Sequence, residues 1–199
     1  MPEHLRALVV ILIASIVGFA VIRPFLRRSL PDLDPRPLAK FWFVVVLLAF
    51  FSHDIYLFLI LTAGYTALAK PVQPASRISL YVLLILAIPN LGARIPGLGI
   101  INYLIDLTYI RVLTLTLLLP LLISHVSPEP ATKKFDKYIL ALFVLCSVLS
   151  FRDVSFTEGS RRSVYYALDM LVPYYAVSRT INSSEDVKEI FAALLIPAF

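Results

Sequence analysis

The sequence has few charged residues and a single cysteine, whereas many soluble domains are rich in charge and many secreted domains are rich in cysteine. Of its 199 residues only 16% are charged and one is cysteine, whereas an average soluble domain is about 25% charged. The lone Cys146 cannot form an internal disulfide, which excludes a disulfide-rich class. Glycine is scarce, and the sequence has no phosphate-binding glycine loop, nucleophile elbow or Cys/His metal spacing. These gaps argue against an ATPase, a serine hydrolase and a metal site.

Hydrophobic residues make up 59% of the chain, and its mean hydropathy is +0.86. They come in blocks of about 10 to 20 residues, which a water-soluble globule of this size could not bury. The sequence therefore predicts one all-α domain over residues 1–199, a polytopic transmembrane helix bundle. We expect about seven to eight membrane segments, some of them short or broken.

The basic residues lie mostly between the apolar blocks, so membrane topology explains the net charge of +5 without nucleic acid. The block 41–69 is longer than the roughly 20 residues that one span needs, and Ser52-His53-Asp54 lies in its middle. Two short helices in this block put eleven Lys and Arg residues inside and five outside, whereas one span gives eight and eight. The broken form is favoured, with the amino terminus outside.

Both ends of the sequence carry helix signals. The first block, Leu8 to Leu26, is followed by no small-residue cleavage site, which favours an uncleaved span over a signal peptide. Near the other end, Ser183-Ser184-Glu185-Asp186 followed by Val187-Lys188-Glu189 is typical of a helix start, with Ser/Glu capping and acidic residues in the first turn. About ten apolar residues from Ile190 onward are too few to cross a bilayer. We expect the amino-terminal part of a longer membrane protein; the alternative is a half-inserted terminal helix.

Five arginines are candidates for binding a lipid diphosphate. Arg152, Arg161 and Arg162 lie in a short segment that the predicted topology places outside, against the usual charge bias. Guanidinium groups bind phosphate in a bidentate manner, and a lipid diphosphate presents phosphate at the membrane surface. The alternative is a solvated loop with an internal Arg–Asp pair. Arg94 lies in the Gly- and Pro-bearing stretch 92–99, which permits a tight or re-entrant backbone. Arg94 and Arg111 either join the same anionic site or, for Arg111, pair with Asp106.

Three further ionisable residues are candidates for lining a pocket. His53 and Asp54 lie at the predicted break between two helices, as corner residues or as a proton carrier. Asp169 lies in the middle of a span with no charge one turn away, so it faces other helices or a cavity. The histidines are scattered without metal-ligand spacing, and no cofactor is expected.

Two stretches, 88–120 and 151–179, resemble the amino-terminal half of bacterial O-antigen ligase and polysaccharide polymerase-like membrane proteins. The resemblance covers roughly residues 40–190. Its motifs are Ile88-Pro89-Asn90, Ile95-Pro96-Gly97, Tyr109-Ile110-Arg111, Leu118-Leu119-Pro120, Phe151-Arg152-Asp153 and Pro173-Tyr174-Tyr175-x-x-Ser178-Arg179. The last of these, after an Arg-bearing loop, is the most specific.

The resemblance implies a multi-pass protein of the bacterial inner membrane that acts in polysaccharide biosynthesis. Such glycosyltransferases move a glycan from undecaprenyl diphosphate to an acceptor on the periplasmic side, without metal or nucleotide. Outer-face arginines bind the diphosphate, a role that Arg152, Arg161 and Arg162 match here. The family's large outer loop and second half of helices are absent from this sequence. Two other classes remain open, half of a secondary transporter or flippase and a non-catalytic membrane scaffold.

Overall fold

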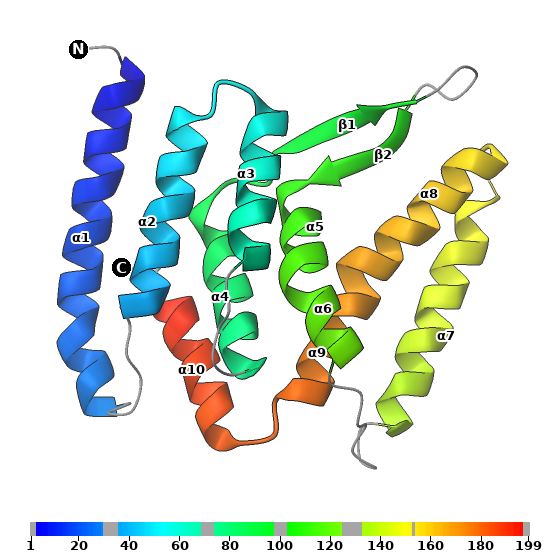
Figure 1. Cartoon of the computed structure of the whole chain (residues 1–199). Coiled ribbons are helices and arrows are strands. Elements are labelled where there is room, and N and C mark those ends of the chain that lie inside the picture. The colour runs from blue at the N-terminus through cyan, green and yellow to red at the C-terminus, as the bar shows by residue number, and fades with distance from the viewer. Residues whose placement is uncertain are drawn as a thin grey trace. The chain divides into compact units, whose positions relative to one another are not determined.

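A computed structural model describes residues 3–29, 36–68, 74–97, 103–124, 133–152 and 154–196 of the chain (Figure 1). The described part is mostly helical, which confirms the helical class. The chain divides into two compact units. Unit 1 contains Met1–Leu91 together with Asn182–Phe199, and unit 2 contains Gly92–Ile181. The last helix of the chain therefore belongs with the first four.

Unit 1 is a set of five helices built around α4. Its helices are α1 (Glu3–Ser29), α2 (Arg36–Phe51), α3 (Ile55–Leu68), α4 (Pro74–Ala87) and α10 (Ser184–Leu195). Helix α4 packs against both α2 and α10. Its Leu83 and Leu84 are fully buried, as are Val45 of α2 and Ala193 of α10. Small residues on α10 let the two backbones approach, since alanine adds little between them.

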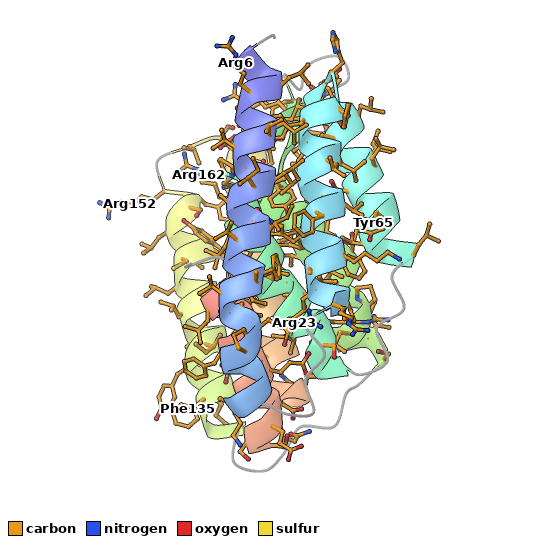
Figure 2. All side chains as sticks on the ribbon, turned by 90° about the vertical axis from the view of Figure 1, so that its left-hand side faces the viewer. Arg6, Arg23, Tyr65, Phe135, Arg152 and Arg162 are labelled. Carbon is orange, nitrogen blue, oxygen red and sulfur yellow. The ribbon has the colours of Figure 1, made fainter. Side chains whose placement is uncertain are left out.

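Among the described residues, α1 is the one helix long and apolar enough to cross a membrane. Its apolar part, Leu5–Pro24, has 20 residues and a mean hydropathy of 2.7. Arg6 and Arg23 lie toward the two ends of this helix (Figure 2). Only 17% of the apolar window is buried inside the protein. A signal sequence near an amino terminus can have the same length and composition.

The predicted break in the block 41–69 is confirmed. Helix α2 ends at Phe51 and α3 begins at Ile55. Asp54 lies just before α3, and its Oδ1 accepts a hydrogen bond of 3.0 Å from the backbone N–H of Tyr56. Its backbone carbonyl accepts the first bond of the helix, from Phe58. A short polar side chain here satisfies a helix N–H that would otherwise lack a partner, so the new helix starts at this point.

Unit 2 combines a β-hairpin with helices. Strands β1 (Gly92–Pro96) and β2 (Tyr103–Thr108) pair antiparallel, with Arg94 opposite Asp106. The remaining elements are α5 (Tyr109–Leu113), η1 (Thr114–Leu118), α6 (Leu119–Ser124), α7 (Lys133–Ser150), α8 (Phe156–Tyr166), η2 (Ala167–Leu171) and α9 (Val172–Thr180). The hairpin departs from the predicted all-α class. It forms where the sequence indicated a tight or re-entrant backbone.

Two π-helical segments, η1 and η2, occupy equivalent positions before a proline. Proline lacks an N–H and its ring collides with the carbonyl four residues earlier, so it disturbs the preceding helical turn. Pro120 and Pro173 each follow the end of a π segment by two residues. Just before each proline, the turn is widened: Leu119 N–H bonds to Thr114 O, and Val172 N–H to Ala167 O. Such widened turns are rare and often lie at functional sites.

The corner between α7 and α8 requires a glycine. A Cβ on Gly159 would lie 2.5 Å from a ring carbon of Phe151, which is far closer than van der Waals contact. The ring therefore lies directly on the α8 backbone. Ser155 caps the helix, and its Oγ accepts a hydrogen bond from Glu158 N–H. This corner fixes where the first turn of α8 begins.

Helix α10 begins with the capping box that the sequence indicated. Ser183 Oγ accepts from Asp186 N–H at 3.1 Å, and Asp186 Oδ2 accepts from Ser183 N–H at 3.0 Å. Burial alone would raise the pKa of Asp186. Hydrogen bonds from the backbone of Asn182 and Ser183 and from the Ser183 hydroxyl outweigh it and hold the pKa below its usual value.

The Ser183→Ala substitution is expected to destabilise α10 by about 1 kcal/mol, because it removes one half of this box. The contribution of Asp186 is present above its unfolded-state pKa and is lost as the pH falls through its lowered folded-state pKa. Amide hydrogen exchange of α10 at neutral and acidic pH measures both effects. Asp186→Asn is the control. Without the carboxylate, the protection of α10 against exchange should no longer fall in acid through protonation of residue 186. Equal acid sensitivity in the wild type and in Asp186→Asn would contradict the assignment.

Candidate functional site

Two rows of polar residues contact each other within unit 2. One row follows β2 into α5, and the other follows α8 into η2. Along the second row the residues recur every three or four positions, which places them on one helix face. The first row is Tyr103, Asp106 and Arg111, and the second is Glu158, Arg161, Tyr165 and Asp169. Side-chain contacts between these rows join the hairpin to the helix.

The end of the rows nearest the start of β2 is centred on the carboxylate of Glu158. The Tyr103 hydroxyl donates to Glu158 Oε2 at 3.0 Å, and Arg161 Nη1 lies 2.6 Å from the same oxygen. The Arg161 guanidinium also lies 4.0 Å from the centre of the Tyr103 ring. The guanidinium of Arg94, on β1, lies over the same ring at 5.4 Å. A tyrosine ring thus holds two cations near each other.

This group carries more positive than negative charge. Arg162 Nε approaches the other oxygen of Glu158, Oε1, at 3.5 Å. Two guanidinium groups therefore contact this carboxylate, and a third, that of Arg94, lies over the Tyr103 ring. The side chain of Arg162 is 47% exposed, whereas that of Arg161 is 13% exposed. We call Arg94, Tyr103, Glu158, Arg161 and Arg162 the arginine cluster.

The pairing of Arg111 with Asp106, one of the two alternatives, occurs through the Asp106 backbone and not as an ion pair. Arg111 pairs instead with Asp169, with Nη2 to Oδ2 at 2.8 Å and Nε to Oδ1 at 3.1 Å. Its Nη1 donates to the backbone oxygen of Asp106 at 2.7 Å. The guanidinium lies 3.8 Å from the centre of the Tyr165 ring, and the Tyr165 hydroxyl accepts from Asp106 N–H at 2.7 Å. Arg111 therefore fastens the end of β2 to the helix.

This ion pair gives Asp169 a charged partner. Asp169 has no charged neighbour one turn away on its own helix, and its partner comes from α5. The Arg111 side chain is only 12% exposed, whereas that of Asp169 is 41% exposed. With its donors engaged by Asp169 and Asp106, Arg111 has a structural function. The other alternative placed Arg111 in the anionic site, and among the described residues no interaction links it to the arginine cluster.

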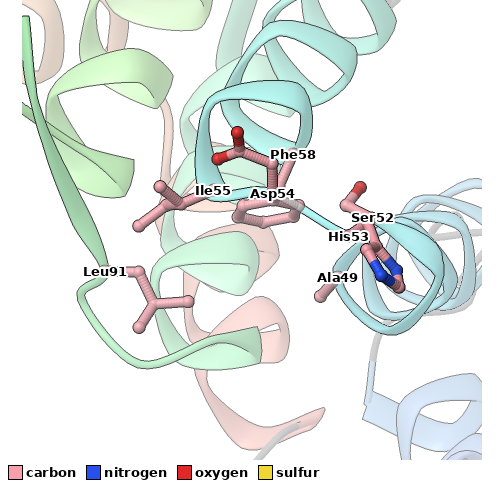
Figure 3. Close-up of a pocket in the computed structure, with 7 residues that line it drawn as sticks. All are labelled: Ala49, Ser52, His53, Asp54, Ile55, Phe58 and Leu91. Carbon is pink, nitrogen blue, oxygen red and sulfur yellow. The ribbon is translucent and has the colours of Figure 1, made fainter.

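The other predicted residues lie elsewhere. Arg152 is exposed on the turn after α7, and its side chain projects away from the ribbon in Figure 2. Asp153, the partner considered for an internal pair, lies outside the described residues. His53 and Asp54 are in unit 1, at a cavity of about 170 Å³ (Figure 3). The other residues that line it are Ala49, Ser52, Ile55, Phe58 and Leu91.

The sequence did not indicate a second charged group, which joins α9 to α7. Arg179 Nη2, on α9, lies 3.1 Å from Asp136 Oδ2 on α7, and the Tyr174 hydroxyl donates to Asp136 Oδ1 at 3.1 Å. The Arg179 guanidinium stacks 4.1 Å from the centre of the Tyr175 ring. The partners are 43 residues apart, so no local pattern indicated that they meet.

A scan of protein-family models, a search of curated proteins and a search of solved structures each found no match to this chain. The arrangement of its own residues therefore carries the functional conclusion.

The Asp169→Asn substitution should destabilise unit 2 by about 1–2 kcal/mol, because it leaves a mostly buried guanidinium without its anion. A loss of that size lowers the Tm by about 2–8 °C. Thermal unfolding in detergent measures the change for Asp169→Asn, Arg111→Gln and the double variant. The double variant should cost less than the sum of the single variants. Strictly additive costs would contradict a direct interaction.

Proposed function

We propose that this chain is the membrane-embedded front part of a lipid-carrier-dependent glycan ligase or polymerase. In this proposal the arginine cluster binds the diphosphate of an undecaprenyl diphosphate-linked glycan on the periplasmic side of the bacterial inner membrane. The observation that carries it is that the guanidinium groups of Arg161 and Arg162 share the single carboxylate of Glu158, which also bonds to Tyr103 of the hairpin. The surplus positive charge calls for an anionic ligand.

Exposed apolar surface supports placing these helices in a membrane. On α7, large hydrophobic side chains are exposed around most of the helix. They are Phe135, Tyr138, Leu140, Leu142, Val144, Leu145, Val148 and Leu149. Exposed valines and isoleucines likewise cover α1. A soluble monomer rarely exposes such continuous apolar surface, and lipid is a natural solvent for it.

Most described helices are shorter than a full span. Helix α2 has 16 residues and α3 has 14, or about 24 and 21 Å at 1.5 Å per residue. A hydrocarbon core is about 30 Å thick. We therefore propose a polytopic bundle in which α1 crosses fully and shorter helices cross with polar extensions or only in part. Protein neighbours or water must then satisfy the exposed backbone ends.

The chemistry assigned to the arginine cluster is stabilisation of the leaving group. An acceptor hydroxyl attacks the anomeric carbon of the glycan, the bond to the carrier oxygen breaks, and the diphosphate departs with the electron pair. Guanidinium groups placed at the diphosphate stabilise that developing charge. A general base must take the proton of the acceptor, and we assign that role to no residue of this chain.

Arg161→Ala should weaken binding of undecaprenyl diphosphate by about tenfold or more, since one charge-assisted contact with phosphate is worth roughly 1.5–3 kcal/mol. Equilibrium binding to the chain in lipid nanodiscs measures the loss. Arg6→Ala is the matched control, because it removes the same charge from α1 in the other unit.

In the longer protein of which this chain is the proposed front part, Arg161→Ala and Arg162→Ala should also abolish glycan transfer. Wild-type affinity in both variants would overturn the assignment. Carrier binding with no transfer by that longer protein would favour the flippase alternative.

A further inference from the structure

The carboxylate of Glu158 occupies the position that an anionic ligand of the arginine cluster would take. Its Oε2 accepts from the Tyr103 hydroxyl and from Arg161, and its Oε1 faces Arg162 Nε. Guanidinium and phenol donors converging on two oxygens provide what a phosphate group also needs. Ligand and carboxylate therefore compete for the same donors.

The carboxylate of Glu158 has a second possible partner, the backbone N–H of Ser155. Glu158 stands three residues after the N-cap residue Ser155, so the two have the spacing of a capping box. Half of that box is formed, because Ser155 Oγ accepts from Glu158 N–H. At the start of α10, Ser183 and Asp186 form both halves. In α8 the carboxylate bonds to the arginine cluster, whereas in a complete box it would bond to the Ser155 backbone N–H.

The move between these two places is small. The Glu158 side chain is 25% exposed, and rotation about its own bonds can carry the carboxylate to the helix end. There it would lie near the unpaired N–H groups of the first turn, where negative charge is favoured. Neither the hairpin nor α8 has to shift for the exchange.

The exchange also favours ligands that carry two phosphate groups over ligands that carry one anionic charge. A headgroup with one anionic charge replaces one anion by another and gains few new contacts. A diphosphate carries a second phosphate that can reach the exposed Arg162 after the first has replaced the carboxylate. The ordinary anionic phospholipids of a membrane would then bind too weakly to block the site.

We propose that Glu158 is an internal counter-ion that a lipid diphosphate displaces from the arginine cluster, and that swings to the Ser155 N–H when the ligand binds. This inference rests on the proposed function, because it takes the same site and the same ligand.

Binding of undecaprenyl diphosphate to the full chain in nanodiscs tests the exchange with two variants. Glu158→Gln removes the competing charge and should raise the affinity by about tenfold, the loss of one charge-assisted contact. Glu158→Asp keeps the charge but shortens the side chain, so that it should favour the capping box, as Asp186 does, and release the arginines. It should therefore raise the affinity nearly as much.

Phosphatidylglycerol, a weak competitor for the wild type, should compete visibly with the lipid diphosphate in both variants. Inorganic pyrophosphate is measured beside the lipid, so that recognition of the diphosphate is separated from recognition of the lipid chain. Glu185→Gln, on α10, is the control for removing a negative charge elsewhere and should bind as the wild type does. Thermal unfolding of each variant shows that it is folded.

The possible outcomes separate the two proposals. Unchanged or lower affinity in Glu158→Gln, while Arg161→Ala still loses binding, overturns the exchange and leaves the proposed function standing. A gain in Glu158→Gln without one in Glu158→Asp means that net charge alone acts, and it also overturns the exchange. Absence of binding in the wild type and in every variant overturns the proposed function and the exchange with it.

Discussion

The shared carboxylate of Glu158 is the interaction on which the candidate site depends. It receives the hydroxyl of Tyr103 from the hairpin and the guanidinium of Arg161 from its own helix. With no anion at this position, the like-charged Arg161 and Arg162 would repel each other and the Tyr103 hydroxyl would lose its bond to α8. The same carboxylate that assembles the cluster also neutralises part of its charge. Holding a site together and occupying it are thus functions of one residue.

The second row of contacts gives this junction its rigidity. Arg111 bonds at once to the β2 backbone and to Asp169, so the hairpin is held at both ends of the polar rows. The prolines act through the helix backbone, because each widens the turn before it into a π segment. One such segment carries Asp169. Its phase along the helix, and therefore its access to Arg111, depends on that widened turn.

Local features of the fold could be predicted from the sequence, and long-range pairs could not. The break after Phe51 and the cap at Ser183 are confirmed, because each depends on residues within one helical turn. Gly92, Pro96 and Gly97 indicated an unusual backbone, yet hydrophobic residues there suit a strand or a short helix equally well. Arg94 was a candidate for the same site as Arg161, and the guanidinium groups of both lie over the Tyr103 ring. Asp169, the partner of Arg111, lies 58 residues further along the chain, and residue spacing predicts only contacts within one element.

We propose that α7, one of the helices shorter than α1, crosses the membrane and that the turn after it, next to the arginine cluster, faces the outside. Single cysteines at exposed positions near its two ends test this directly, in a Cys146→Ser background. Arg152→Cys marks the turn and Lys137→Cys the start of α7. In intact spheroplasts, a membrane-impermeant maleimide should label Arg152→Cys and should reach Lys137→Cys only after the membrane is opened. Labelling of both positions in intact spheroplasts, or of Lys137→Cys alone, would contradict the account.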